Sequence, residues 1–146
     1  LTIPNEILTV KAEPVTDIEP LKEIFPEMVG TIIQNGLVGL AGNQVGILKR
    51  IFVMRYGEGF IPVINPKIVP DRIKGEKWGW ESCGSIPKVA CLVKRWAKIE
   101  LEFTSLDGES KSMTLTGEDA IIAQHEESHL RGVLITHVAR ERRFIR

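Results

Sequence analysis

The chain has 146 residues, of which 43% are hydrophobic and 26% are charged, and its formal net charge is zero. This length and composition predict one soluble domain, residues 1–146, that buries a core without disulfide bridges. No apolar run approaches the roughly 18 residues that a membrane span needs. The lack of a global basic charge argues against direct binding of nucleic acid. The start shows no signal-peptide pattern, which predicts a cytoplasmic location.

The first third of the chain is predicted to contain one long helix. Four apolar residues recur there at helical spacing, Leu21, Ile24, Met28 and Ile32. Asp17 can cap the start of this helix, and Gly36 is a natural stop. Pro26 lies inside the pattern and removes a backbone donor, so we expect the helix to kink or restart there. Residues 1–4 are expected to be extended.

A run of small residues from Val38 to Gly46 surrounds one glutamine, Gln44. Glycines allow a backbone to approach another surface closely, and they also serve in a plain turn. No Lys-Ser/Thr pair follows the run, which argues against a phosphate-binding loop. The Gln44 amide could donate to a developing oxyanion, and a structural role for this side chain is the alternative.

The middle of the chain is predicted to form antiparallel β-structure. The expected strands span residues 50–54, 60–66, 97–105 and 111–115. Hairpin turns are expected at residues 56–59 and 107–108, and residues 67–77 are expected to form a turn and an edge strand. Residues 78–87 bring aromatics, a carboxylate and a thiol together. Residues 140–146 are basic and are interpreted as a solvated terminus.

The pattern His125-Glu126-x-x-His129 predicts a helix that binds a metal ion. Residues four apart lie on one helix face, so the two imidazoles would point at one ion with Glu126 beside them. This arrangement suits hydrolysis, which needs a Lewis acid to activate water and a carboxylate to take and return its proton. Thr116 is expected to cap the helix, with Asp119 completing a capping-box pattern.

A catalytic tetrahedral site needs a third protein ligand and an open position for water. Cys83 is one candidate because its thiolate is a soft and strong ligand, although a buried free thiol is the alternative interpretation. His137 is the other candidate and would indicate a zinc endopeptidase. However, it lies two residues beyond the position that a long-helix zinc-protease pattern requires, which is Ile135. Cys91 has no such neighbours and is expected in the core.

Three separated stretches together resemble the signatures of the peptide deformylases, which remove the formyl group from the N-terminal methionine of nascent chains. These stretches are Val38–Gly46 (VGLAGNQVG), Glu81–Pro87 (ESCGSIP) and Gln124–Gly132 (QHEESHLRG). The resemblance extends over essentially the whole chain. It implies an α+β fold in which antiparallel strands surround a central helix that carries metal ligands, with an irregular N-terminal helix packed outside.

The resemblance also implies the composition of the active site. The metal ligands would be Cys83, His125 and His129. They would hold one divalent ion, which is natively ferrous iron in this family and is often replaced by nickel, cobalt or zinc. Glu126 would act first as the general base and then as the acid. Gln44 and the backbone N–H of Gly84 would bind the oxyanion.

For the substrate, the resemblance implies an apolar pocket that accepts the methionine side chain. The matching positions are Val38, Ile86, Ile121, Ile122 and the face of His125. The peptide backbone would run beside Gly39 and Ile86 like an added strand, which would make specificity strong for the first residue and weak for later ones.

The chain departs from the usual signatures at four positions. The family usually has Gly at Leu37, Gly at Ser82, Leu at Gly84 and Asp at Ser128. Gly84 keeps its backbone N–H but adds flexibility, so the oxyanion donor is expected to be less firmly held. Ser128 cannot supply the charge of the usual carboxylate, and supporting groups of this kind matter about 10- to 100-fold. Glu81, Glu127 and Arg95 are candidates for compensation.

The chain ends soon after the predicted catalytic helix and lacks the long C-terminal helix that bacterial members use to contact the ribosome. It is therefore similar to the short members that bacterial viruses encode. Formyl-methionyl peptides are the expected partners, a monomer is expected, and a ribosome contact is left open. The alternative is a catalytically inactive module that keeps the metal for structure and binds nascent chains or the ribosome. Glu126 argues against it, because a structural site does not need a general base.

Overall fold

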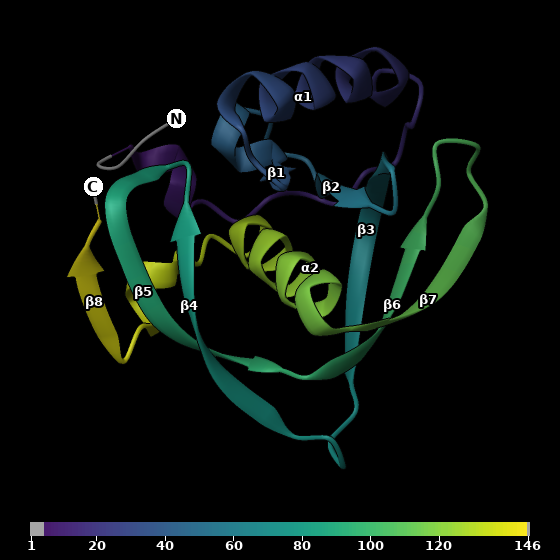
Figure 1. Ribbon diagram of the computed structural model, residues 1–146. Coiled ribbons are helices and arrows are strands. Elements are labelled where there is room, and N and C mark those ends of the chain that lie inside the picture. The colour runs from purple at the N-terminus through teal and green to yellow at the C-terminus, as the bar shows by residue number, and fades with distance from the viewer. Residues whose placement is uncertain (1–4, 146) are drawn as a thin grey trace.

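The computed structural model describes residues 5–145, in which two antiparallel sheets lie around helix α2 (Figure 1). The expected extension of residues 1–4 lies outside this part of the chain. The elements are η1 (Glu6–Thr9), α1 (Leu21–Asn35), β1 (Gly39–Ala41), η2 (Gly42–Val45), β2 (Ile51–Tyr56), β3 (Gly59–Pro70), β4 (Glu76–Cys83), β5 (Ile86–Trp96), β6 (Lys98–Thr104), β7 (Ser110–Thr116), α2 (Gly117–Leu130), α3 (Ile135–Val138) and β8 (Glu141–Phe144).

The two sheets confirm the predicted α+β architecture. The first sheet has the strand order β1-β2-β3-β6-β7, and the second has the order β4-β5-β8. Helix α2 packs against both sheets, while α1 lies outside the first one (Figure 1). Strands β1 and β4 are edge strands, each on its own sheet. No helix within residues 5–145 is long and apolar enough to cross a membrane.

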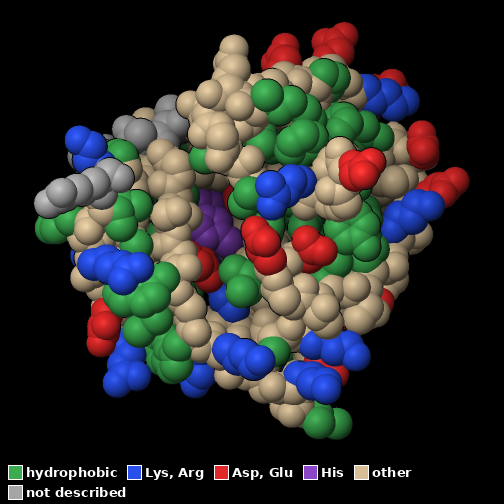
Figure 2. Space-filling model, in the orientation of Figure 1, with side chains coloured by type: hydrophobic (Ala, Val, Ile, Leu, Met, Phe, Trp, Pro, Cys, Tyr) green, Lys and Arg blue, Asp and Glu red, His purple; other side chains and the backbone are tan. Residues whose placement is uncertain are grey.

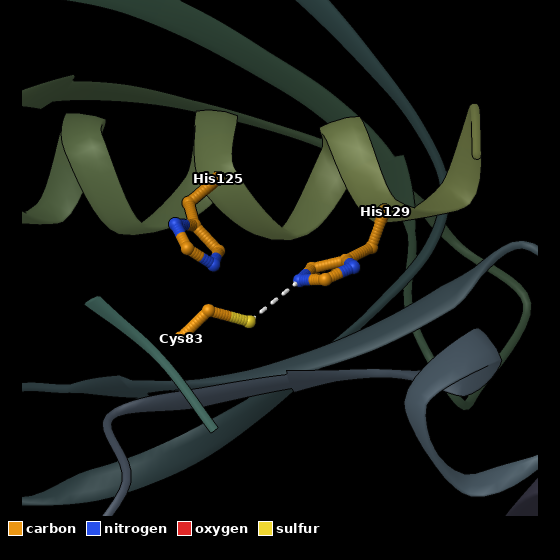
Figure 3. A group of neighbouring side chains, drawn as sticks. All are labelled: Cys83, His125 and His129. Atoms are coloured by element: carbon orange, nitrogen blue, oxygen red, sulfur yellow. Dashed lines mark hydrogen bonds between the residues drawn. The ribbon is translucent and has the colours of Figure 1, made fainter. Parts of the chain in front are cut away.

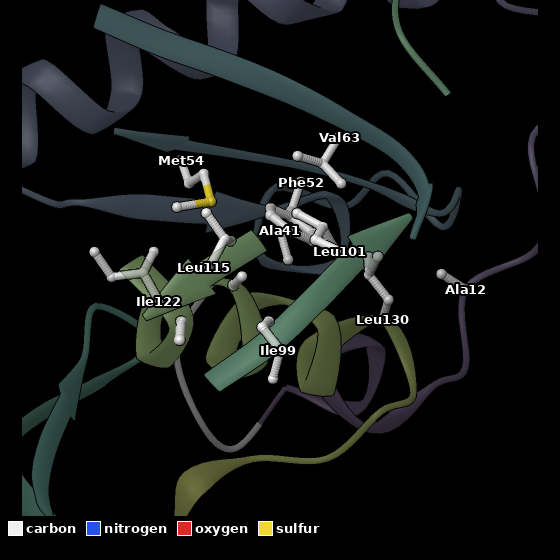
Figure 4. Packing of buried hydrophobic residues seen from close by; sticks show 12 residues of the cluster. Ala12, Ala41, Phe52, Met54, Val63, Ile99, Leu101, Leu115, Ile122 and Leu130 are labelled. Carbon is white, nitrogen blue, oxygen red and sulfur yellow. The ribbon is translucent and has the colours of Figure 1, made fainter. Parts of the chain in front are cut away.

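Strand β2 is buried on both of its faces. Successive side chains of a strand point to opposite sides, so Val53 packs under α1 beside Met28, whereas Phe52 and Met54 face α2. The cluster between the first sheet and α2 includes Phe52, Met54, Leu101, Leu115, Ile122 and Leu130 (Figure 4). This packing fixes α2 against the sheet and so fixes the direction in which its histidines point.

Helix α1 ends at Asn35 as predicted, but it begins at Leu21 after Pro20, so the expectation that Asp17 caps it is wrong. Its residues Leu21, Met28 and Ile32 are buried, and Gly36 ends it in the left-handed conformation at φ 62°. The expected break at Pro26 is wrong, because a single helix runs from Leu21 to Asn35. A proline this close to the start removes one hydrogen bond of the second turn, and the burial of the apolar side compensates for that loss.

Three other expectations need correction. Thr116 does precede α2, but its side chain makes no capping hydrogen bond. Strand β3 continues to Pro70 through an irregularity at Asn65, where its pairing passes from β2 to β6. The terminus interpreted as solvated forms β8, which pairs with β5 while its side chains remain exposed.

Candidate active site

Cys83, His125 and His129 converge from two elements (Figure 3). Cys83 is the last residue of β4, and the histidines lie one turn apart on α2. Their ligand atoms all lie within 4.8 Å of one another. Cys83 Sγ is 3.3 Å from His129 Nε2, and the two imidazole centroids are 5.2 Å apart. The residues are only 9%, 9% and 1% exposed, so the group is shielded from bulk water.

Glu81 and Arg95 support His125 from behind. Glu81 Oε1 lies 2.9 Å from His125 Nδ1, and Arg95 donates to both Glu81 oxygens at 2.9 and 3.0 Å. Arg95 also donates to Ser128 Oγ at 3.1 Å, which links this pair to α2. Glu127, the third candidate for compensation, is instead bound by Arg131 at 2.9 Å. The buried carboxylate of Glu81 therefore orients His125, as the hydrogen-bond partners of metal ligands do in metal sites.

Burial and hydrogen bonding shift the pKa values of the two histidines in opposite directions. Burial lowers the pKa of His125, but its interactions with the nearby Cys83 and Glu81 outweigh this effect and raise that pKa to about 10. Burial, together with the nearby charge of His125, lowers the pKa of His129 to about 3. A metal ion that binds here therefore has to displace a proton from His125 but not from His129.

Glu126 is buried without a hydrogen-bond partner for Oε1 among the described residues. It is 5% exposed, and burial raises its pKa to about 7. The other carboxylate oxygen presses against β1, where a Cβ atom on Gly39 would lie only 2.6 Å from Oε2. A carboxyl group with a pKa near neutrality can both accept and release a proton at physiological pH.

Gln44 is oriented by a backbone contact. The Ala41 N–H donates to Gln44 Oε1 at 2.9 Å, which turns the amide nitrogen toward the metal ligands. Gln44 Nε2 lies 3.1 Å from Ser85 Oγ and 3.6 Å from Cys83 Sγ. Ser85 was not expected to take part in the site, although it lies two residues after Cys83 in the same stretch. Its contact with Gln44 and its 1% exposure place it behind this amide.

A cavity of about 550 Å³ opens beside this group. In Figure 2 it is visible as a hollow with a histidine surface at its floor and acidic side chains beside it. The expected site residues that line it are Val38, Gly39, Gln44, Cys83, Gly84, Ile121, Ile122, His125 and Glu126. Ile86 does not line it, because this residue is 2% exposed and packs with Leu8 and Cys91. Leu37 lines it without having been assigned a role.

His137 is not part of the metal group, so the expectation that it could be the third ligand is wrong. Its ring is exposed, and its Nδ1 accepts a hydrogen bond from the Leu134 N–H at 3.0 Å, which caps the short helix α3. The position that the sequence left open is filled by Cys83. Cys91 is fully buried in the core, as predicted.

The donor set fits a divalent transition metal. One thiolate and two imidazoles suit iron, nickel, cobalt or zinc, and three protein ligands are the number that leaves a position open for water. The buried carboxylate of Glu126 lies beside these donors, and the cavity gives a substrate access to them. The fold and the site together define a metal-dependent hydrolase.

Comparison with known proteins narrows this class. The family model described as polypeptide deformylase matches residues 1–144. The peptide deformylase of Thermoanaerobacter pseudethanolicus is 43% identical over 135 residues, which cover 90% of this chain and 82% of that protein. The chain belongs to the peptide deformylase family, whose reaction is the removal of the N-formyl group from nascent polypeptides.

Solved structures agree with this assignment. The peptide deformylase of Thermotoga maritima superposes with a TM-score of 0.90 at 35% identity, covering 96% of this chain and 95% of that one. A probable peptide deformylase from Synechococcus phage S-SSM7 superposes with a TM-score of 0.87 at 32% identity, covering 94% and 96% of the two chains.

Proposed function

We propose that Cys83, His125 and His129 hold one divalent metal ion, and that Glu126, Gln44 and the Gly84 N–H act around it in deformylation. When bound, the metal would lower the pKa of a water molecule and polarise the formyl carbonyl. The observation that carries the proposal is the buried Glu126 carboxyl group beside the ligand group, because its Oε1 has no hydrogen-bond partner among residues 5–145. A buried carboxyl oxygen without a partner is costly to a fold, so its presence argues for a chemical role.

Glu126 is proposed to move the proton. It takes a proton from the attacking water and delivers it to the nitrogen of the departing amine, while the bond between the formyl carbon and that nitrogen breaks. Formate and a free N-terminus leave. Burial raises the pKa of this carboxyl group to about 7 in the metal-free chain, and a carboxyl group near neutrality can both take and return a proton.

Gln44 and the Gly84 N–H are proposed to donate to the oxyanion that forms on the formyl oxygen. The Ala41 N–H holds Gln44 Oε1, which turns the amide nitrogen toward Cys83 and Ser85 at the cavity. Gly84 directly follows the ligand Cys83 and lines the same cavity. Preorganised donors of this kind contribute about 10²- to 10³-fold each to a reaction rate.

The substrate is proposed to bind between the two edge strands. Val38, Ile121 and Ile122 provide an apolar wall for the methionine side chain. Strand β1 has a partner on one side only, which leaves its other edge available to the backbone of a peptide near Gly39. Ile86 is proposed only as support from behind, because its side chain is in the core.

Two variants test this assignment of the metal ligands. Cys83→Ala should lose bound metal and formate release from formyl-Met-Ala-Ser, because it removes one of three ligands. His137→Ala should keep a full complement of metal and activity near that of the wild-type chain. Metal analysis and formate release on the same samples distinguish the two readings. Metal loss in His137→Ala with retention in Cys83→Ala would support the endopeptidase alternative instead.

We further propose ferrous iron as the native metal and a monomer in the cytoplasm as the working form. The thiolate and imidazole ligands are compatible with iron but do not select it. Metal analysis after expression without added metals, and size-exclusion chromatography with light scattering, test these two points. A ribosome contact stays a prediction, which co-sedimentation with ribosomes tests.

A further inference from the structure

The side chain of Leu37 lies directly over Gly84. A Cβ atom built on Gly84 would lie 3.2 and 3.4 Å from the two Leu37 methyl carbons, which is a tight contact. Leu37 follows α1, and Gly84 lies in the turn between β4 and β5. Both residues line the active-site cavity, so Leu37 reaches across from one wall of the cavity to the other.

The backbone of Gly84 does not itself require a glycine. Gly84 is absent from the residues with positive φ, so an L-residue could adopt its conformation. The space for a side chain is what is missing, because Leu37 already occupies it. Leu37 therefore supplies from the opposite wall the packing that a side chain at position 84 would otherwise provide.

Leu37 is itself firmly held. Its N–H donates to the Ile32 carbonyl at 3.0 Å, as part of the hydrogen bonding that ends α1 at Gly36. Its side chain packs against the cluster that contains Met28 and Leu40. Gly84, in contrast, is exposed and has no side chain to anchor its peptide. Contact with Leu37 therefore adds a restraint to the pairing of Cys83 with Ile86, which closes this turn.

We propose that Leu37 is a positioning residue that holds the Gly84 peptide so that its N–H stays directed at the oxyanion. This inference rests on the proposed role of the Gly84 N–H. Leu37 touches no reacting atom in this account. It acts by excluding the alternative backbone conformations that a glycine would otherwise adopt, and so it keeps the donor preorganised.

The first test measures the Gly84 amide directly. In zinc-loaded protein labelled with ¹⁵N-glycine, the Gly84 order parameter should be near 0.85 in the wild-type chain and below about 0.6 in Leu37→Gly. The matched control is Ile33→Ala on α1, a residue that is 65% exposed, which should leave the Gly84 signal unchanged. An equal Gly84 order parameter in the wild-type chain and Leu37→Gly overturns the proposal.

The second test measures turnover of nickel-loaded protein. Leu37→Gly should lower kcat about tenfold with little change in KM, because a donor is misplaced rather than removed. Gly84→Leu alone should also lose activity, since its side chain meets Leu37. The double variant Leu37→Gly/Gly84→Leu should recover kcat to within about threefold, because the space is refilled from the other wall.

The outcomes separate this inference from the proposed function. The role of Leu37 is overturned if the Gly84 order parameter falls in Leu37→Gly while kcat is unchanged. It is also overturned if the kcat of the double variant is no higher than that of either single variant. A loss seen only in KM would also overturn it, since that loss would mean a simple binding contact. A wild-type chain that carries metal but releases no formate would overturn the proposed function. In that case the Gly84 order parameter would still decide whether Leu37 restrains this peptide.

Discussion

Glu126, the proposed general base, is buried in a way that costs stability. Its carboxyl group is 5% exposed, and Oε1 lacks a partner among the described residues. The backbone of Gly39 approaches the other oxygen so closely that no side chain fits between them. The H-E-x-x-H pattern predicted this carboxylate, but it could not show that a glycine from a distant strand positions it. That contact depends on how β1 packs across α2.

We predict that Gly39→Ala lowers kcat about 100-fold while the metal stays bound. The added methyl group would lie 2.6 Å from Glu126 Oε2 and would push the carboxylate away from the reacting water. Gly59→Ala is the matched control, because nothing lies within 4 Å of the corresponding methyl position. Kinetics together with metal analysis check this. Normal turnover in Gly39→Ala would mean that the position of Glu126 is not critical.

A second prediction concerns pH and the stability of metal-free protein. The pKa of Glu126 is about 7 in the folded chain against an ordinary 4.5, so the folded state holds its proton more tightly than the unfolded state does. The unfolding free energy should therefore fall as pH rises from 4.5 to 7, and the loss should be complete above 7. Glu126→Gln removes this loss.

Urea unfolding at two pH values measures this effect. The unfolding free energy of Glu126→Gln minus that of the wild-type chain should increase by about 2 kcal/mol between pH 5 and pH 8. Glu102→Gln, at an exposed position on β6, should show no such growth. A difference that is independent of pH would show that Glu126 titrates normally in the folded chain.

Helix α2 shows what sequence patterns can and cannot reveal about an element. The helix and the common face of its histidines were predicted, since that follows from a spacing of four residues. Glu81 and Arg95, which support His125, lie on β4 and β5, and these two long strands were not predicted from the sequence. Alternation is obscured there, because Trp78 and Trp80 on one face are partly exposed. Strand β3 was predicted too short because of its prolines, of which Pro66 lies in the irregularity while Pro62 and Pro70 keep the regular pairing.

The contact between β4 and α2 leads to a prediction about metal affinity. Glu81→Gln should weaken metal binding about 10- to 100-fold, because the charged partner of His125 Nδ1 is lost. Glu76→Gln lies at the exposed start of the same strand and should bind metal as the wild-type chain does. Competition with a chelator measures both variants. Equal affinities would show that Glu81 supports the fold but not the metal.

The packing of the elements shows how the departures from the family signatures at positions 37, 84 and 128 are accommodated. Leu37 and Gly84, which are 47 positions apart in the printed sequence, are in contact, so the side chain missing at 84 is replaced by one from 37. Ser128 accepts a hydrogen bond from Arg95 and donates to the Gln124 carbonyl at 2.8 Å. The sequence identified these positions but could not show which residues contact each other, because such contacts depend on tertiary packing.

Across the chain as a whole, the active site lies where two sheets meet around one helix. Strand β1 belongs to one sheet and β4 to the other (Figure 1), and residues of both strands line the cavity that Figure 2 shows as a hollow. The fold class and the ligand set were predicted from three motifs. The division into two sheets and the addition of β8 were not, because strand order is set by long-range pairing. That residues 1–146 form one domain stays a prediction.

The metal group also predicts sensitivity to air. An iron-loaded preparation should lose activity in air through oxidation of the metal or of the Cys83 thiolate, whereas a nickel-loaded preparation should keep it. Activity followed over time, with mass spectrometry of Cys83, measures this. Restoration by a reductant and fresh iron would place the damage at the metal. Equal decay of both preparations would contradict the prediction.

The most direct test of the account is formate release from formyl-Met-Ala-Ser by nickel-loaded wild-type chain and Glu126→Ala, with metal content measured on the same samples. The account predicts turnover in the wild-type chain and its loss in Glu126→Ala, with about one nickel ion bound to each. Turnover that survives in fully metallated Glu126→Ala would contradict the role given to this carboxylate. A fully metallated wild-type chain without turnover would contradict the enzyme itself.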